Sequence, residues 1–505
     1  MVELLQKHTA TEVMKTLQGL PLGLPGLYER ILLQIEQRHV ETSARILRLV
    51  ITAARPFSIE ELGAAIRCKP PDFIDAGQAI RDELTHCGPF VTETGGMVGF
   101  VHASVPDYLL HADADSNPPP DVFCINPSAA HFGLARVCID SMKASYTSKR
   151  THVIAPYART FWPLHAQHSD ELGDELIEQC RSFFEISGGG SKVLRMWWIL
   201  RGERETTRIF YSAPRMRVDS RATPLHQACY LGIVPWARII LGPSAGQGLS
   251  HLGSPSDTDK YASSALHYAA FRGQARLVEL LIEHGAGIHA QGYMNHTALD
   301  FAAYNGDINV VQLLLDCGAD ENHCGDVPRG TAVHYALAGG HEAVLRLLLA
   351  HRGDIHLKAS DGSRMLHYAA GRQEGAVLRV LIEHGADVTA QDRLGRTALH
   401  IAAFHGNKGN IRALVKRGAS LEARDRSGSI ERGAYVDIRT SLGLTAVHTA
   451  SSRGHKGVVR ILLEHGAKPD IADLAGVSAL FIAAARGYDG IVSLLVQHGA
   501  VDTRK

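Results

Sequence analysis

The sequence carries no net charge and no paired cysteine motif. Its 52 Lys and Arg residues balance 52 Asp and Glu residues, so we expect no bulk electrostatic attraction to nucleic acid or to a membrane surface. The eight cysteines are scattered, and no two have the Cys-x-x-Cys spacing of a zinc or redox site. Free thiols in a reducing compartment suit this pattern better than disulfides, which favours the cytoplasm, with the nucleus as an alternative.

Long hydrophobic runs are also missing. No apolar stretch approaches the roughly 20 residues that a helix needs to span a bilayer. The first residues of the sequence lack the layout of a secretory signal. We therefore expect no membrane partner.

Several catalytic motifs are absent as well. There is no Gly-x-x-x-x-Gly-Lys-(Ser/Thr) phosphate-binding loop, no Gly-x-Ser-x-Gly elbow and no His-Glu-x-x-His motif. Residues 188–192 come nearest to a phosphate loop, but their order is wrong and they suit a linker. Cys317 and Cys324 flank His323, a trio too isolated to predict a metal site. We expect no catalytic residue, no cofactor, no metal and hence no enzyme.

A repeated phrase occupies the second half of the chain. The segment 397–403 reads Thr-Ala-Leu-His-Ile-Ala-Ala, and relatives of it return almost every 33 residues. A period of this length is typical of stacked repeats, each of which buries its apolar face only against its neighbours. Function is therefore expected on a long shared surface. The repeats begin at Thr223, Ser264, Thr297, Thr331, Arg364, Thr397, Thr445 and Ser478.

The repeat that begins at Ser264 shows the expected local structure. Residues 265–270 begin a short helix, which Gly273 ends, and residues 275–282 form a second helix with one apolar face. The remainder, up to residue 296, is polar and predicts a projecting hairpin. A Ser or Thr at the start of each repeat caps the first helix, and the His three residues later is expected to form hydrogen bonds in the turn and with the next repeat.

These residues resemble the ankyrin repeat. Thr223-Pro-Leu-His226 matches that family's opening phrase in every residue, and the resemblance extends over residues 220–505. It implies a mainly α-helical solenoid of helix-turn-helix units with hairpins. The departures from the pattern are Asp300 and Phe481 in place of His, Arg364 in place of Thr, and Gln373 in place of the helix-ending Gly.

The longest interval departs furthest from the period, because Thr397 and Thr445 lie 48 residues apart. The extra segment, residues 430–444, aligns with residues 382–396 without a gap. We interpret it as the end of a truncated repeat that lost its first 18 residues at the Ser429–Ile430 junction, by deletion or by a gene-model error. The alternative is an ordinary hairpin insertion. A real junction predicts a loop or kink in the stack.

The first part of the chain has another character. Residues 24–32, 54–62 and 102–109 resemble the segment that follows the nucleotide-binding NACHT domain in fungal-type STAND proteins, which are similar to NOD-like receptors. Residues 157–165 are similar to the helical bridge of that family. The resemblance implies the tail of a NACHT-like domain at 1–19, a winged-helix-like module at 20–115 and a helical linker region at 116–219. The nucleotide-binding domain itself is expected upstream of Met1.

Binding in ankyrin-like stacks commonly uses the hairpin tips and the exposed ends of the first helices. Aromatic residues and arginines recur there, and both are frequent interface anchors. We therefore expect a concave surface for a protein or peptide ligand with acidic residues and apolar anchors. The alternative is that the arginines are solvated or satisfy nearby carbonyls and glutamates. The predicted binding residues are Tyr230, Phe271, Arg272, Tyr304, Asn305, Arg372, Arg393, Arg396, Phe404, His405, Arg453 and Arg486.

The sequence thus predicts an interaction scaffold or ligand-sensing module of a STAND-type signalling protein. The alternative is a fragment of an ATP- or GTP-dependent NACHT protein whose catalytic domain lies upstream. The balanced charge argues against a nucleic-acid partner. The oligomeric state stays open.

Overall fold

The structure, a computed structural model, divides into two compact units. The first unit comprises residues 1–204 and 223–254, and the second comprises residues 205–222 and 255–505. The expected NACHT-like tail, the 188–192 linker and the Ser429–Ile430 junction lie outside the described residues. The structure describes residues 24–66, 76–110, 119–148, 153–184, 194, 198, 222–242, 253–325, 330–356, 362–373, 375–420 and 436–501.

The first unit begins with a small module of helices around a three-stranded sheet. The sheet is antiparallel with the order β1-β3-β2, and Phe57 pairs with Val98. Tyr28, Phe57 and Phe90 lie in its core. The module contains α3 (Leu24–Leu33), α4 (Gln37–Thr52), β1 (Phe57–Ser58), α5 (Ile59–Ile66), α6 (Ala76–His86), the 3-10 helix η1 (Gly88–Phe90), β2 (Val91–Thr94), β3 (Met97–Phe100) and α7 (Ser104–Leu109).

Reciprocal capping starts α5. The Glu61 backbone N–H donates to Ser58 Oγ at 3.2 Å, and the Ser58 N–H donates to the Glu61 carboxylate at 3.1 Å. This is the capping box that the Ser-x-x-Glu spacing predicts. Arg55 binds the same carboxylate with both guanidinium nitrogens at 2.6 and 2.7 Å, and this contact lowers the pKa of Glu61.

A helical region completes the first unit. Trp162 is fully buried there against Phe183 and Phe184, and Trp236 of a later helix also contacts Phe184. The first helix pair of the repeats therefore packs within the first unit. The helices are α8 (Pro127–Ser148), α9 (Ala155–Gln167), the 3-10 helix η2 (Asp170–Leu172), α10 (Gly173–Gln179), α11 (Arg181–Phe184), α13 (Pro224–Leu231) and α14 (Val234–Leu241).

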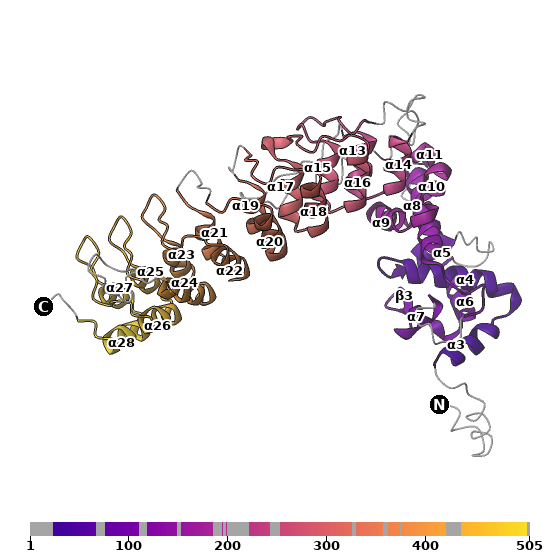
Figure 1. Ribbon diagram of the computed structural model, residues 1–505. Helices are drawn as coiled ribbons and strands as arrows, with labels where there is room; N and C mark the ends of the chain where they lie inside the picture. Colours follow the sequence, from indigo (N-terminus) through magenta and orange to yellow (C-terminus); the bar gives the residue numbers. More distant parts are fainter. Residues whose placement is uncertain are drawn as a thin grey trace, which may run out of the picture. The chain divides into compact units, whose positions relative to one another are not determined.

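The second unit is a stack of helix pairs. Each first helix packs on the first helices of its neighbours, and the second helices form a parallel row. Figure 1 shows the hairpins projecting from the side away from the second helices. The pairs are α15 (Ala265–Phe271) and α16 (Ala275–Glu283), α17 (Ala298–Asn305) and α18 (Ile308–Asp316), α19 (Ala332–Gly339) and α20 (Glu342–Ala350), α21 (Met365–Gly371) and α22 (Gly375–Glu383), α23 (Ala398–His405) and α24 (Lys408–Ser420), α25 (Ala446–Ser452) and α26 (Lys456–Glu464), and α27 (Ala479–Ala485) and α28 (Asp489–Gln497), with the 3-10 helix η5 (Tyr293–Asn295) in one hairpin.

Where a repeat keeps the Thr-x-x-His phrase, the phrase caps the first helix and joins it to the following hairpin, and a glycine ends the helix in α23. In α23 the Thr397 N–H donates to His400 Nδ1 at 3.2 Å, so Nδ1 is unprotonated and Nε2 carries the hydrogen. Nε2 then donates to the Leu444 carbonyl of the following hairpin at 3.0 Å. Gly406 ends the helix at φ 74°, a left-handed conformation that a side chain disfavours.

The missing glycine at Gln373 is replaced by contacts from the next repeat. Arg372, which follows α21, is extended with ψ 148° instead of left-handed. Asn407 and Asn410 each donate from Nδ2 to the carbonyls of Ala370 and Arg372, at 2.7 to 3.1 Å. Buried amides thereby satisfy the helix-terminal carbonyls that a glycine cap would otherwise satisfy.

The long interval does not interrupt the stack. The helix α23 packs directly on α25, and α24 packs on α26. Residues 436–444 form the hairpin of the repeat that begins at Thr397, because Ser441 N–H donates to the Leu394 carbonyl of the preceding hairpin at 2.9 Å. The described part of the predicted truncated repeat 430–444 therefore serves as the hairpin of the repeat that begins at Thr397, which agrees with both the truncated-repeat interpretation and the insertion alternative.

Candidate functional site

The predicted surface residues of the second unit lie at two places on the stack. Arg372, Phe404, His405, Arg453 and Arg486 lie at the C-terminal ends of first helices, and we call them the inner face. Arg393 lies at a hairpin tip and is exposed. Arg372 is half-buried, while the other residues of the inner face are exposed.

Two inner-face residues from neighbouring repeats stack on each other. The guanidinium carbon of Arg453 lies 3.8 Å from the centre of the Phe404 ring. Phe404 is 41% exposed, and His405 contacts the same ring at 5.1 Å. A guanidinium at this distance is attracted by the electron-rich ring face. The pair therefore presents an apolar surface and a positive charge together.

Arginines of the stack differ in whether acidic side chains neutralise them, and Arg379, Arg412 and Arg460 of the second helices form no ion pair with the described residues. On the second helices, Arg346 pairs with Glu342 and Glu383 at 3.0 and 2.8 Å. In contrast, Arg372, Arg393, Arg453 and Arg486 form no ion pair with any residue that the structure describes. The inner face and the tip thus carry positive charge that no acidic side chain among the described residues neutralises.

Two predicted binding residues have structural roles instead. Tyr230 is only 2% exposed and packs edge-on against Trp198 at 5.2 Å, in the core of the first unit. Arg396 pairs with the buried Asp392 at 2.7 Å, and several contacts from Arg396 and Leu394 lower the pKa of that carboxyl against the opposing effect of burial. Tyr230 was wrongly predicted to lie on the binding surface because the first repeat packs on preceding helices. Arg396 instead stabilises its own hairpin.

The remaining predicted residues lie in the first repeats of the second unit. Phe271 is half-buried and contacts Phe301 edge-on at 6.0 Å, while Arg272 and Asn305 are exposed. Tyr304 is half-buried, and its carbonyl accepts a hydrogen bond from His341 Nε2 at 2.9 Å. This part of the surface is more apolar and less positively charged than the later repeats.

Three exposed apolar residues and one arginine were missed by sequence reasoning. Tyr368 of α21 is 45% exposed, and Leu442 and Leu474 at hairpin tips are 66% and 75% exposed. Arg439 precedes Leu442 and is also exposed. Alignment of the tip glycines Gly395, Gly443 and Gly476 provides the signal that could have identified these tip residues.

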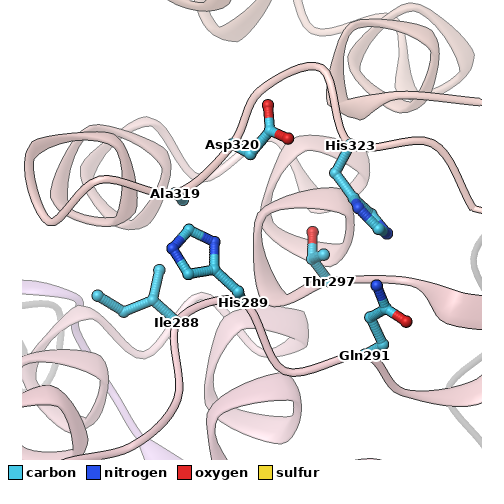
Figure 2. A pocket seen from close by; sticks show the side chains of 7 residues that line it. All are labelled: Ile288, His289, Gln291, Thr297, Ala319, Asp320 and His323. Carbon is cyan, nitrogen blue, oxygen red and sulfur yellow. The ribbon is translucent and has the colours of Figure 1, made fainter.

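A small hollow of about 200 Å³ lies between two earlier hairpins (Figure 2). It is smaller than the roughly 300–1,000 Å³ of pockets that hold drug-sized ligands. Asp320 accepts a backbone hydrogen bond from Asn322, and His323 bonds to the Asn295 carbonyl at 2.9 Å. These side chains therefore maintain the hairpin geometry. The lining residues are Ile288, His289, Gln291, Thr297, Ala319, Asp320 and His323.

Within the described ranges, no three His, Cys, Asp or Glu residues are grouped so that they could hold a metal ion. No helix in those ranges is both long and apolar enough to cross a bilayer.

Comparison with known families decides the fold family. The profile described as "Ankyrin repeats (3 copies)" matches residues 249–324, 299–392, 333–425 and 429–505, which together are just over half of the chain. The chain belongs to the ankyrin-repeat family.

Solved ankyrin structures are similar in sequence. A domain from Acinetobacter baumannii is 28% identical, covering 40% of this chain and 98% of its own with a TM-score of 0.35, and human ASB11 is 25% identical, covering 49% and 100% with a TM-score of 0.39.

Two curated relatives come from fungi. Vegetative incompatibility protein HET-E-1 of Podospora anserina is 33% identical over 104 residues, which are 20% of this chain and 8% of that protein. Azaphilone pigments biosynthesis cluster protein L of Monascus ruber is 25% identical over 294 residues, which are 54% of this chain and 61% of that protein. The ankyrin chain thus spans less than two thirds of either relative.

Proposed function

We propose that this ankyrin protein binds an acidic segment of another protein on the concave side of its later repeats. The observation that carries the proposal is the Phe404–Arg453 stack, an exposed aromatic ring held against an unneutralised arginine at 3.8 Å. Aromatic residues and Arg dominate the energetics of many protein interfaces. The stack orders both side chains before binding, which lowers the entropic cost of forming a contact.

The charge distribution favours an acidic partner. Arg453 and Arg486 lie at equivalent positions of consecutive repeats and form no ion pair with the described residues. Arg346 on the second helices is neutralised by two glutamates. Arg453, stacked on the exposed Phe404 ring, and Arg486 of the next repeat therefore attract an acidic segment and fix its register.

Peptides selected from a random display library against the full chain test this proposal. We expect the selected sequences to combine Asp or Glu with apolar residues. Arg453→Glu with Arg486→Glu is expected to weaken their binding at least tenfold. The matched control is Arg379→Glu with Arg412→Glu, which makes the same charge change on exposed second-helix positions. Equal binding by the inner-face and control variants would refute the proposal.

For the first unit, we infer a winged-helix-like coupling module of a STAND-type protein. The element order from α4 to β3 is helix, strand, helix, helix, strand, strand, and the sheet order is β1-β3-β2. Both suit a winged helix. The sequence similarity to HET-E-1 supports the fungal STAND context.

Two segments that carry the STAND resemblance also contact each other. The Ala54 N–H donates to Tyr157 Oη at 2.9 Å, and Tyr157 Oη is hydrogen bonded to His165 Nε2 at 2.8 Å. His165 Nδ1 then bonds to His131 Nδ1 at 2.9 Å, and burial lowers the pKa of His165 to about 3. This buried relay fixes the strand-bearing module on α9, as a coupling role requires.

The alternative is that the chain is the C-terminal part of a NACHT nucleotide-hydrolysing protein. Sequencing the full-length transcript distinguishes the two. An in-frame Gly-x-x-x-x-Gly-Lys-(Ser/Thr) motif upstream of Met1 supports the alternative. A stop codon directly upstream supports a separate interaction protein that works without its own nucleotide switch.

A further inference from the structure

The hairpins of the last repeats expose a row of leucines, which we call the tip row. Leu394, Leu442 and Leu474 are 55%, 66% and 75% exposed. Backbone hydrogen bonds join consecutive tips, from Ser441 N–H to the Leu394 carbonyl at 2.9 Å and from Leu474 N–H to the Leu442 carbonyl at 3.1 Å. The leucines therefore lie side by side in a fixed register.

Glycines allow this close contact between tips. Gly395 has φ 71°, and a Cβ atom there would lie 2.7 Å from Ser441 N. Gly443 has φ 80°, and a Cβ atom there would lie 2.8 Å from Leu474 N. Both turns need the left-handed conformation and the missing side chain. The tip row is thus held by the backbone and is formed before any partner arrives.

The spacing of the leucines matches one face of an α-helix. Leu394 and Leu442 occupy equivalent positions of consecutive repeats, which places them about 8–10 Å apart, the usual distance between packed helices. Leu442 and Leu474 are directly hydrogen bonded and lie about 5 Å apart. With a rise of about 1.5 Å per residue, a helix meets these sites with residues i, i+7 and i+11, which share one face.

An extended segment fits the same row less well. A strand advances about 3.3 Å per residue, so the first interval spans about three residues. Residues separated by three point to opposite faces of a strand. An extended peptide therefore cannot place side chains on both Leu394 and Leu442, whereas a helix can.

The charged residues around the tip row favour a docked helix that carries acidic residues beside its apolar face. Arg393 and Arg439 are exposed and form no ion pair with the residues that the structure describes. The hairpin carboxylates are already engaged: Asp392 binds Arg396, Asp437 accepts the Lys468 N–H, and Asp473 accepts the N–H groups of residues 475 and 477. Exposed arginines therefore border the apolar row, while the half-buried carboxylates of Asp437 and Asp473 lie against the hairpin backbone.

We propose that the tip row docks an amphipathic α-helix of a partner protein, with apolar residues at i, i+7 and i+11 and acidic residues beside them. This inference rests on the proposed function, since it adds a second contact, on the tips, for the acidic partner that the inner face binds. The tip row and the inner face lie at opposite ends of the first helices, because each hairpin enters the N-terminus of a first helix and the inner face lies at its C-terminus.

Two helical peptides of about 20 residues, long enough to hold a helix, test the proposal on the full chain. The striped peptide carries Leu at i, i+7 and i+11 with Glu beside them, and the scrambled peptide has the same composition with Leu spread around the helix. Fluorescence anisotropy is expected to show the striped peptide binding at least tenfold more tightly.

Chain variants locate the site. Leu394→Ser, Leu442→Ser and Arg439→Glu are each expected to raise the Kd of the striped peptide about tenfold. The control Ile308→Ser removes a similarly exposed apolar side chain from a second helix and should leave the Kd unchanged. All four changes are at exposed positions, and unchanged thermal melting confirms that each variant is folded.

The outcomes separate this inference from the proposed function. Equal affinity for the two peptides, no binding of either, or no effect of the tip variants overturns the helix-docking inference. If Arg453→Glu with Arg486→Glu still weakens the library-selected peptides, the proposed function stands. A striped peptide with Lys in place of Glu that binds equally well overturns the acidic flanks of the docked helix. Dimerisation of the chain that Leu442→Ser abolishes assigns the row to a second copy and overturns the partner-helix inference.

Discussion

His400 Nε2 donates a hydrogen bond to the carbonyl of Leu444 at 3.0 Å, across 44 residues of sequence. Elsewhere in the stack the same bond spans 29 residues. The excess is 15 residues, and the interval between Thr397 and Thr445 exceeds the usual 33 by the same amount. The extra residues therefore leave the register of the stack unchanged. The bonds across 29 residues join His267 to His296, His367 to Arg396, and His448 to Val477.

Replacing His400 is expected to destabilise the stack at the long interval. His400→Ala leaves the buried Thr397 N–H and the Leu444 carbonyl without these partners, at a cost of about 2 kcal/mol. Urea unfolding of the full chain measures the loss. His289→Ala at an exposed position is the control and should change stability by less than about 0.5 kcal/mol. A His400 variant as stable as this control contradicts the structural role of the bond.

The capping histidines are expected to make the stack sensitive to acid. Burial lowers the pKa of His400 and of His334 to about 4, from an ordinary value of 6.5. Between these values the unfolded chain binds protons that the folded chain does not, so the free energy of unfolding falls as the pH falls from 6.5 to about 4. His400→Gln removes one such group. Denaturant titrations at several pH values should show a shallower fall for this variant, and an unchanged slope contradicts the assignment.

Asp300 is expected to have the opposite effect on the pH dependence, so that it destabilises the stack as the pH rises. Its carboxylate accepts the Thr297 N–H at 2.9 Å and lies 4.0 Å from His296 Nδ1. Burial raises the pKa of Asp300 to about 7, so the folded chain holds a proton that the unfolded chain releases above its own pKa near 4. The contribution of Asp300 to the free energy of unfolding is therefore greatest at low pH and falls as the pH rises from about 4 to about 7.

The substitution Asp300→Asn keeps an oxygen for the Thr297 N–H and removes the charge. We expect this variant to unfold at higher urea concentration than wild type at pH 8, by a few kcal/mol at about 1.4 kcal/mol per pKa unit. The difference should shrink toward pH 4. A gain that is the same at both pH values would mean that the carboxyl group does not titrate differently in the folded chain.

Asn410 and Gln373 are expected to be coupled. Asn410→Leu removes bonds to the carbonyls of Ala370 and Arg372, which should cost about 1–3 kcal/mol. Gln373→Gly allows a left-handed cap like that at Gly406, so the same Asn410 change should cost less in this background. A double-mutant cycle by urea unfolding measures the coupling. Strictly additive losses would show that the asparagine does not compensate for the missing glycine.

Sequence reasoning succeeded where a repeat is regular. The Thr-x-x-His caps, the helix-ending Gly406 and the Ser58–Glu61 capping box follow from local hydrogen bonding, and the structure confirms them. It failed for Tyr230, because packing of the first repeat on preceding helices is a long-range contact that no periodicity reveals.

The sequence by itself determined the ankyrin repeat, because period, caps and glycines act within one repeat and the next. Only the tertiary structure showed that residues 436–444 complete the repeat of Thr397, that Arg396 is neutralised by Asp392 while Arg453 stacks on Phe404, and that Leu394, Leu442 and Leu474 form one row. Each of these depends on distances between residues of different hairpins or helices. Such distances arise when the repeats stack, since burial and hydrogen bonding across repeats fix them together.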